Sequence, residues 1–430
     1  MPGYPTSCQT LISQNGHIEY TQIAVIILAA VFLLIAFRQV GRFRVRIWQI
    51  MLGGALAVLV TGQITFTDAL RAINPDVMVF LFGMFVVGEG LVASGYLECI
   101  AHNLFYNTKT VDGLVIVMML CMGLLSALLM NDTLAIIGTP LVLALSKKFH
   151  ISPKLLLLTL AIAVTTGSVL SPIGNPQNLL VAVNSGIQAP FITFALYLAL
   201  PTIVNLLIAY AILRIFYVRE FTPLPLEDRL PVTCDSRFMH ICQCSLGIII
   251  TLIATNVILS LIGAGFFITI PLIALCAAVP ILLLSEKRGE VVRGIDWYTL
   301  VFFAAMFVLM ESVWQTGFFQ SFIDRSVVSS VPTILATSVV ISQFVSNVPF
   351  VSLFQPMILQ AGGSTAQLMA LAAGSTIAGN LTILGAASNV IIIQNAEKQG
   401  ETLTFWEFAK VGLPLTVIQV AVYWAFLSLF

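Results

Sequence analysis

The sequence has little charge. Asp, Glu, Lys and Arg make up only 9% of its 430 residues, whereas soluble domains use about 25%. The 19 basic residues balance the 19 acidic residues, so no positive excess is present that would bind nucleic acid. Hydrophobic residues make up 59%, and the mean hydropathy is +1.02. The composition therefore predicts a polytopic protein that lies in a lipid bilayer.

Cysteine and histidine are also scarce. The one close pair among the seven cysteines, Cys242 and Cys244, is too near along a helix for a disulfide and lacks the partners of a zinc site. The sequence contains no nucleophile motif, phosphate loop or dinucleotide fingerprint, and these are the patterns that would indicate an enzyme. We therefore expect a protein that is not an enzyme and that has no metal or cofactor beyond bound sodium.

Apolar segments of membrane-spanning length, about 17 to 25 residues, follow one another along the chain. Two of them are interrupted, and two further apolar pairs turn at polar tips, which is typical of re-entrant hairpins. The expected crossings are 21–37, 45–62, 76–93, 154–185 (interrupted), 190–218, 241–262, 267–284, 296–313, 365–396 (interrupted) and 409–430, and the expected hairpins are 111–145 and 331–361.

The two halves of the chain share residues in the same order, which indicates an internal duplication. The matches are Gly174 with Gly385 and Asn178 with Asn389 at an offset of 211, Asn131 with Asn347 at 216, and Glu89 with Glu311 at 222. We therefore predict an all-α polytopic fold with two repeats, 1–218 and 241–430, joined by a charged linker, 219–240. Each repeat would contain five transmembrane helices, one of them broken, and one re-entrant hairpin.

An odd number of crossings in each repeat inverts the second repeat relative to the first. With the N-terminus outside, every Lys and Arg except Arg71 and Arg325 falls on the inside, as the positive-inside rule requires. We therefore expect both termini outside the plasma membrane and the linker 219–240 in the cytoplasm.

Each interrupted segment contains a break rich in Gly and Asn. Irregular backbone at membrane depth is tolerated only where protein buries it or where it lines a wet cavity, and matched broken helices are the best sequence indication of a transporter's binding site. We expect the carbonyl groups freed by Pro172 and Pro176 to be open to a small cation, and new helix N-termini at Leu179 and Val390 to suit an anion.

Each break is expected to meet the hairpin tip of its own repeat, which gives two pseudo-symmetric pockets. The predicted ion-binding and substrate-binding residues are Asn131, Asp132, Thr133, Ser171, Gly174, Asn175, Gln177 and Asn178 in the first pocket, and Ser346, Asn347, Thr382, Gly385, Ser388 and Asn389 in the second.

Three acids in apolar surroundings are candidates for ion coupling. Asp132 lies at the first tip, where the second tip has Val348. An ionised carboxylate at the membrane centre costs at least about 2.5 kcal/mol and is functional by default, so we expect Asp132 to bind sodium or carry a proton; the alternative is an aspartate that only caps the turn. For Glu89 and Glu311 we favour a shared structural role over coupling.

The two tips and the first break resemble the ion transporter superfamily over nearly the whole chain. The relevant motifs are Asn131-Asp132-Thr133, Ser171 to Asn178, and Ser346-Asn347-Val348-Pro349, and they are nearest to the citrate transporter-like and arsenite permease branch. The resemblance implies a scaffold that forms a homodimer and a transport domain that moves as an elevator. It matches the paired Ser-Asn-Thr tips of the dicarboxylate/sodium symporters only in part, and its Asn-Asp tip is more similar to the arsenite permeases, which work in exchange for protons.

We therefore expect a secondary active transporter of a small anion or oxyanion, with arsenite efflux as the leading candidate, coupled to a proton or sodium gradient. A sodium/proton antiporter and a sodium-coupled symporter of di- or tricarboxylates or inorganic anions are the alternatives. No Lys or Arg is predicted inside the apolar spans, so a cation or neutral substrate is equally allowed by the residues alone. A channel is disfavoured, because isolated pockets between apolar helices provide no continuous polar lining.

Overall fold

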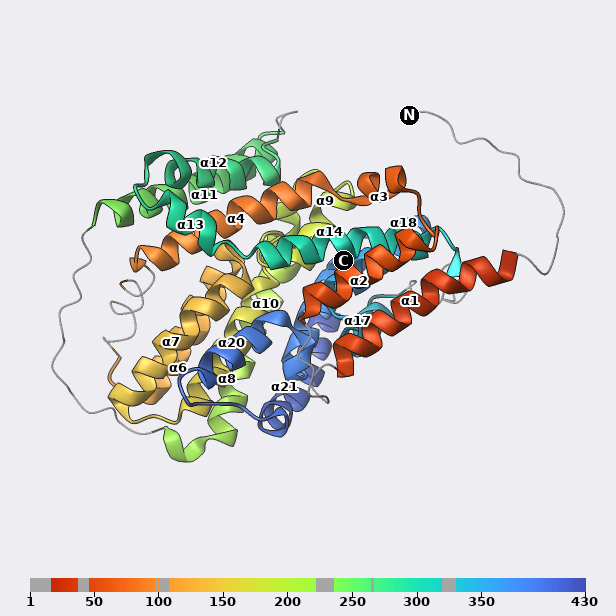
Figure 1. The fold of residues 1–430 in the computed structure, drawn as a ribbon. Helices are drawn as coiled ribbons and strands as arrows, with labels where there is room; N and C mark the ends of the chain where they lie inside the picture. Colours follow the sequence, from red (N-terminus) through yellow and green to blue (C-terminus); the bar gives the residue numbers. More distant parts are fainter. Residues whose placement is uncertain are drawn as a thin grey trace. The chain divides into compact units, whose positions relative to one another are not determined.

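The computed structural model describes residues 17–37, 46–96, 99, 108–221, 236–263, 267–318 and 330–430. In this part of the chain the secondary structure consists of α-helices and short 3-10 turns, without β-strands (Figure 1). Six of the helices are long and apolar enough to cross a membrane. The chain is therefore an all-helical, multi-pass membrane protein, as the sequence predicts.

Helices occupy every predicted crossing and both arms of each predicted hairpin. In the first half they are α1 (His17–Phe37), α2 (Ile47–Val60), α3 (Phe66–Ala72), α4 (Pro75–Ala93), α6 (Val111–Leu129), α7 (Asn131–Phe149), α8 (Pro153–Ser168), α9 (Pro176–Asn184) and α10 (Pro190–Phe216). In the second half they are α11 (Arg237–Leu261), α12 (Ile270–Leu284), α13 (Arg288–Gly294), α14 (Trp297–Trp314), α17 (Val331–Val345), α18 (Asn347–Gln360), α19 (Thr365–Ile377), α20 (Ala387–Glu397) and α21 (Phe405–Leu427).

Helix α11 begins inside the range that we predicted as a linker, 219–240, because Ser236 caps its N-terminus by accepting a hydrogen bond from the Met239 N–H (3.1 Å). The central part of the linker, residues 222–235, lies outside the described residues, as does Arg325.

The chain forms two compact units, and both halves of the sequence contribute to each. The smaller unit comprises residues 1–73 and 301–322, and the larger one comprises 74–300 and 323–430. Within the smaller unit, Gly54 of α2 allows close packing, since a Cβ atom there would lie 2.5 Å from Val31 Cγ2 and 3.2 Å from Leu309 Cδ2. All residues of the predicted pockets belong to the larger unit.

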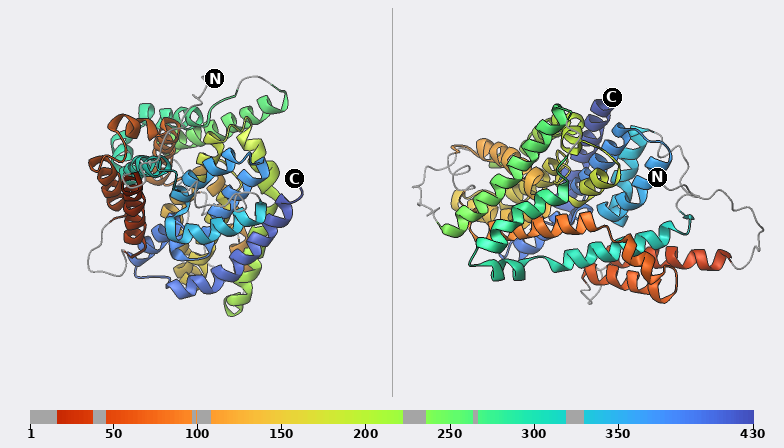
Figure 2. Two further views of the ribbon diagram at one scale, coloured as in Figure 1. Left: turned by 90° about the vertical axis from the view of Figure 1, so that its right-hand side faces the viewer. Right: turned by 90° about the horizontal axis from the view of Figure 1, so that it is seen from above.

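The larger unit contains a layer formed by α4, α11 and α12 and a bundle that includes α6, α7, α8 and α20 (Figure 1). Helices α10 and α21 run antiparallel beside each other (Figure 2). Tyr197, near the start of α10, stacks on Phe430 with 4.2 Å between ring centroids, and Lys410, near the start of α21, lies 5.8 Å from the Phe216 ring. Between these ends, the hydroxyl groups of Thr202 and Tyr423 form a buried hydrogen bond (2.8 Å).

Both hairpins reverse direction at a single non-glycine residue with positive φ. Met130 joins α6 to α7 with φ 70° and ψ 142°, and Ser346 joins α17 to α18 with φ 71° and ψ 152°. Such a conformation costs about 1 to 3 kcal/mol outside glycine and persists only where the surroundings hold it. Because one residue makes the whole turn, the polar residues from Asn131 to Thr133 form the first turn of α7, rather than the loop that we expected.

Candidate functional site

Each break separates two helices at the centre of the larger unit. After the first break α9 begins at Pro176, and after the second α20 begins at Ala387, three residues earlier than the predicted starts. The early start of α9 follows from proline's preference for the first helical position and from the Asn175 side chain, whose Oδ1 accepts a hydrogen bond from the Asn178 N–H (2.8 Å). Gln177 and Asn178 therefore belong to the first turn of α9.

Two matched asparagines satisfy carbonyl groups that the breaks leave without helical donors. The Asn178 amide donates to the carbonyl oxygens of Ser168 (3.0 Å) and Ser171 (3.1 Å). The Asn389 amide donates in the same way to Gly379 (2.6 Å) and Thr382 (3.5 Å). The Ser168 carbonyl, which Pro172 frees, thus already accepts one hydrogen bond within the protein.

The two matched glycines allow each break to fold back against the end of the preceding segment. A Cβ atom at Gly174 would overlap the carbonyl oxygen of Ser168, and one at Gly385 would overlap that of Ala378. An alanine at either position would have to displace backbone, so these two residues shape the breaks and do not act as ligands through a side chain.

The first hairpin tip contacts both breaks. The Asn131 N–H donates to the Gly174 carbonyl oxygen (3.0 Å), and the Asn131 side-chain amide donates to the Ser388 hydroxyl (3.4 Å). The two predicted pockets are therefore joined at this tip. Ser388 is fully buried, and only 5% of the Asn131 surface is exposed.

The second hairpin is fixed to its break by Gln343, one turn before the tip. Its amide donates to the Ala378 carbonyl oxygen (2.8 Å), and its Oε1 accepts from the Thr382 hydroxyl (2.8 Å). Sequence reasoning missed Gln343, although its position offered a signal: it is a polar residue in an apolar hairpin arm, where the matched residue of the first half is Ala127.

Thr376 of α19 connects the second half of the chain to the first break. Its hydroxyl accepts from the amides of Asn175 (3.2 Å) and Gln177 (3.4 Å), and its single proton is shared between the Ala372 carbonyl oxygen (2.7 Å) and Asn178 Oδ1 (3.2 Å). Thr376 corresponds, at the offset of 211, to Thr165 of α8. Thr165 lies beside the second break, where a Cβ atom at Gly379 would be 3.0 Å from its methyl group.

Several buried oxygen atoms around the tips and the second break have no hydrogen-bond partner. Both tip asparagines are among them, although only 5% of Asn131 and 6% of Asn347 is exposed. The unpartnered oxygens are Asn131 Oδ1, Asn347 Oδ1, Asn389 Oδ1, Asn380 Oδ1 and Thr165 Oγ1. Neutral side-chain oxygens of this kind are the ligands that a small hard cation prefers, so the residues present fit a sodium ion.

The helix N-termini at the site differ in their caps. Asn175 caps α9, whereas α7, α18 and α20 have no side-chain cap. The free N–H groups and the positive dipole end of an uncapped helix favour an anion. The hydrogen bond from Asn131 to Ser388 brings the first turns of α7 and α20 together. The positive dipole ends of both helices therefore favour an anion at the same place.

The three candidate acids have different surroundings. Asp132 is half-buried in the first turn of α7 and is repelled by the like charge of Asp296, which caps the start of α14 by accepting from the Thr299 N–H (3.0 Å). Glu89 of α4 covers Gly294 with its carboxylate, and Glu311 accepts a hydrogen bond from Gln315 of its own helix (3.0 Å). Of the three, Asp132 lies among the predicted site residues.

Comparison with known proteins gives the chain its relatives. The sequence profile described as citrate transporter matches residues 32–367. An uncharacterized transporter of Mycobacterium tuberculosis is 28% identical over 93% of this chain and 96% of its own length, and the P protein of Homo sapiens is 22% identical over 95% of this chain and 60% of its own length.

A solved structure has a similar fold. It is the YdaH transporter of Alcanivorax borkumensis, with a TM-score of 0.56, 15% sequence identity, and coverage of 96% of this chain and 97% of that one. The profile match includes both hairpin tips and the first break. The chain therefore belongs to the citrate transporter family of the ion transporter superfamily and is a secondary membrane transporter.

Proposed function

We propose that this transporter moves a small anion or oxyanion, with arsenite-type efflux as the leading candidate, and that a proton or sodium gradient drives it by an elevator mechanism. The observation that carries the proposal is the pair of buried, unpartnered oxygens on Asn131 and Asn347, each directly after the strained residue of a hairpin tip. Oxygens buried without a partner cost about 1 to 3 kcal/mol each, and a bound cation would offset that cost.

Coupling follows from the charges at the site. The anion would be held by the uncapped N-termini of α7 and α20, close to the Asp132 carboxylate, which repels it while ionised. A proton on Asp132, or a sodium ion beside it, removes that repulsion. If the cation stays bound beside the anion, the two bind cooperatively, which gives symport. If the anion and the cation exclude each other from the site, exchange results.

Two alternatives remain within the superfamily. A sodium/proton antiporter would bind the two cations in turn at Asp132 and the neighbouring Asn131 oxygen, without an anion. A sodium-coupled di- or tricarboxylate or inorganic anion symporter is supported by the family's description as citrate transporter. The second tip argues against a dicarboxylate. It carries Val348 at the position that is Thr in the Ser-Asn-Thr tips of the dicarboxylate/sodium symporters.

The inverted repeat is also part of the proposal. It is supported by the matched φ values at Met130 and Ser346 and by the matched amides of Asn178 and Asn389. A homodimer follows from the resemblance to the superfamily, and light scattering of the purified protein would measure it.

The test is flux in proteoliposomes with imposed sodium or proton gradients and a panel of arsenite, phosphate, sulfate, dicarboxylates and sodium itself. We expect saturable flux of one anion that stops when the gradient is removed. Saturable exchange of sodium for protons without any anion would select the antiporter instead. Unsaturable flux that ignores the gradients would overturn the transporter proposal in favour of a channel.

A further inference from the structure

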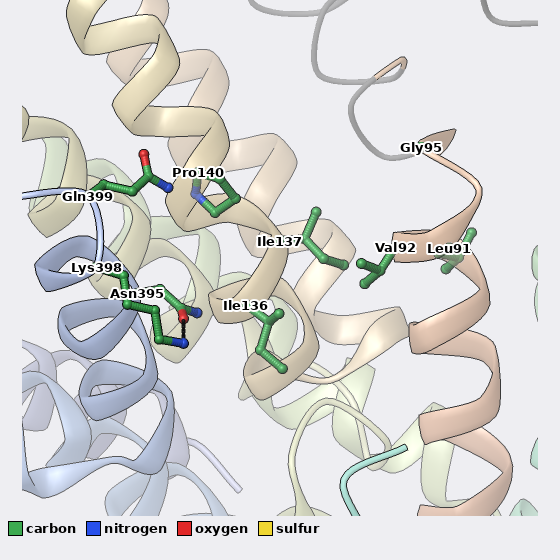
Figure 3. A pocket seen from close by; sticks show the side chains of 9 residues that line it. All are labelled: Leu91, Val92, Gly95, Ile136, Ile137, Pro140, Asn395, Lys398 and Gln399. Atoms are coloured by element: carbon green, nitrogen blue, oxygen red, sulfur yellow. Dashed lines mark hydrogen bonds between the residues drawn. The ribbon is translucent and has the colours of Figure 1, made fainter. Parts of the chain in front are cut away.

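A cleft of about 260 Å³ opens between α4, α7 and α20 (Figure 3). Its walls differ in chemistry. Val92 of α4 and Ile136 and Ile137 of α7 are apolar, whereas α20 contributes Asn395 and Lys398. The volume is below the about 300 to 1,000 Å³ of pockets for drug-sized ligands, which suits a small hydrated anion.

The cleft continues the helix faces that carry the site residues. Residues four apart lie above one another on a helix, so Ile136 and Pro140 share one face of α7 with Asp132. Exposure increases along that face, because Asp132 is half-buried, Ile136 is 42% exposed and Pro140 is exposed.

Helix α20 shows the same progression from Ser388, which is fully buried, through Asn395, which is half-buried, to Gln399, which is exposed. The hydrogen bond between Asn131 and Ser388 joins the two helices at the inner end of these faces. The lining ends at Ile136 on α7 and Asn395 on α20, so the first turns of both helices lie beyond the cleft along the same faces.

Lys398 is the cationic residue that lines the cleft. It lies just after the end of α20, and its ammonium group donates to Asn395 Oδ1 (3.1 Å), which holds the charge on the cleft side of the helix (Figure 3). Apolar walls around a single charge focus its field, because they replace water of high dielectric constant. The mouth of the cleft therefore attracts anions, although the site at its inner end carries the acid Asp132.

We propose that this cleft is the aqueous entrance to the transport site on the membrane side where Lys147 and Lys148 lie, and that Lys398 captures the anion there. The inference rests on the anion transport proposed above, and it adds the route and the residue that recognises the charge. Lys398 acts before the anion reaches Asp132 and the helix N-termini, so it contributes to the rate of capture and not to the turnover of bound anion.

The first experiment asks whether the cleft contains water, and it requires no transported substrate. Ile136→Cys and Leu124→Cys are made in a background in which the native cysteines are replaced by serine. Both native side chains are exposed, at 42% and 58%, but Leu124 does not line the cleft. Membrane-impermeant thiosulfonate reagents are added to each side of sealed vesicles in turn. We expect Ile136→Cys to react from the Lys147 side only and Leu124→Cys to react from neither side. Equal reactivity of the two variants, or reaction of Ile136→Cys from the opposite side, would show that the cleft is not the entrance.

The second experiment measures the charge preference. In the Ile136→Cys background, the rate with an anionic reagent is divided by the rate with a cationic reagent of similar size. Lys398→Gln should lower this ratio about two- to fivefold, Lys398→Arg should retain it, and the exposed Lys410→Gln on α21 should leave it unchanged. The change should shrink as salt is raised. An unchanged ratio in Lys398→Gln would remove the capture role.

The transport assay separates this inference from the proposed function. With the transported anion, Lys398→Gln should raise KM about two- to fivefold at low salt and leave kcat unchanged. Labelling that depends on Lys398 without any coupled anion flux would leave the entrance standing and reject the proposed function. Coupled anion flux together with an unreactive Ile136→Cys would support the proposed function and reject the cleft as the entrance.

Discussion

The first and second pockets have the same backbone design but different polar interiors. In the first, the Thr376 hydroxyl accepts from two site amides and lies 3.2 Å from Asn178 Oδ1, and Asn175 caps the following helix. The matched atoms of the second pocket, Thr165 Oγ1 and Asn389 Oδ1, both lack partners, and the following helix has no side-chain cap. The first pocket carries an acid and one unpartnered oxygen, Asn131 Oδ1, whereas the second carries the unpartnered oxygens Asn347 Oδ1 and Asn389 Oδ1 and no acid.

This difference suggests a division of work. A pocket whose hydrogen bonds are already made is rigid, and the charge on Asp132 can respond there to protonation without rearrangement of its neighbours. A pocket with unpartnered oxygens still has groups that a bound ion can satisfy. We therefore expect charge changes at Asp132 in the first pocket and an additional contribution to cation binding from the oxygens of the second, with the anion where Asn131 and Ser388 join them.

The largest expected effect is loss of coupling in Asp132→Asn. The amide cannot carry the proton or neutralise sodium, and the interaction at stake exceeds about 2.5 kcal/mol, so coupled flux should fall by about 50-fold or more. Proteoliposome flux measures it, and Tm in detergent checks that the protein is folded. Asp68→Asn, at a partly exposed carboxylate outside the pockets, is the control and should retain flux. Flux and coupling as in the wild type would remove Asp132 from the mechanism.

A smaller effect is expected when the second pocket loses one oxygen. Asn347→Ala deletes an unpartnered Oδ1, so the cation concentration that gives half-maximal flux should rise about tenfold, as expected for the loss of roughly 1.4 kcal/mol of binding. Flux at saturating cation should recover. If the variant lowers maximal flux without altering the cation dependence, the second pocket does not bind the cation.

The matched threonines test the comparison through stability. Thr376→Val removes the acceptor of the Gln177 amide and one of the two acceptors of the Asn175 amide, together with the contact to the Asn178 oxygen, and should destabilise the protein by about 1 to 3 kcal/mol. Thr165→Val removes a hydroxyl that has no partner and should change stability by no more than about 0.5 kcal/mol, while it weakens cation dependence. Thermal unfolding of the two variants side by side measures the difference, and equal losses would show that the pockets are alike.

The smallest effect is expected at Glu311. Its hydrogen bond with Gln315 lies within one helix, so Glu311→Gln should alter stability by about 0.5 kcal/mol or less and leave coupling unchanged. Glu89→Gln is measured in the same assay. Loss of coupling in Glu311→Gln would show that a second coupling acid lies outside both pockets.

Sequence reasoning located the helices, the hairpins and both breaks, because long apolar segments and their Gly- and Asn-rich interruptions are local signals. It placed the first turn one residue late and the helices after the breaks three residues late, whereas the second turn, predicted at Ser346 to Pro349, does include Ser346. The reversals depend on the positive φ of Met130 and Ser346, and neither residue type indicates such a conformation. Boundaries of this kind are set by tertiary contacts, such as the bond from the Asn131 N–H to Gly174.

The hydrogen-bond partners of the two breaks were the features of the site that were hardest to predict from the sequence. Asn178 and Asn389 were recognised as site residues, but their task of satisfying carbonyl groups depends on how the chain folds back at Gly174 and Gly385. Thr376 was overlooked because its partners lie in the other half of the chain. Pairing across halves leaves no mark in a single sequence, since it depends on how the two sets of helices pack.

The bond between Asn131 and Gly174 also bears on the order in which the protein is made. A re-entrant hairpin, as the sequence predicts for α6–α7, would carry its tip to membrane depth, where an unpaired N–H group costs several kcal/mol. The Asn131 N–H donates to Gly174, which is synthesised after the hairpin is complete. We therefore expect this hairpin to reach its final position only after α8 and the break have been made.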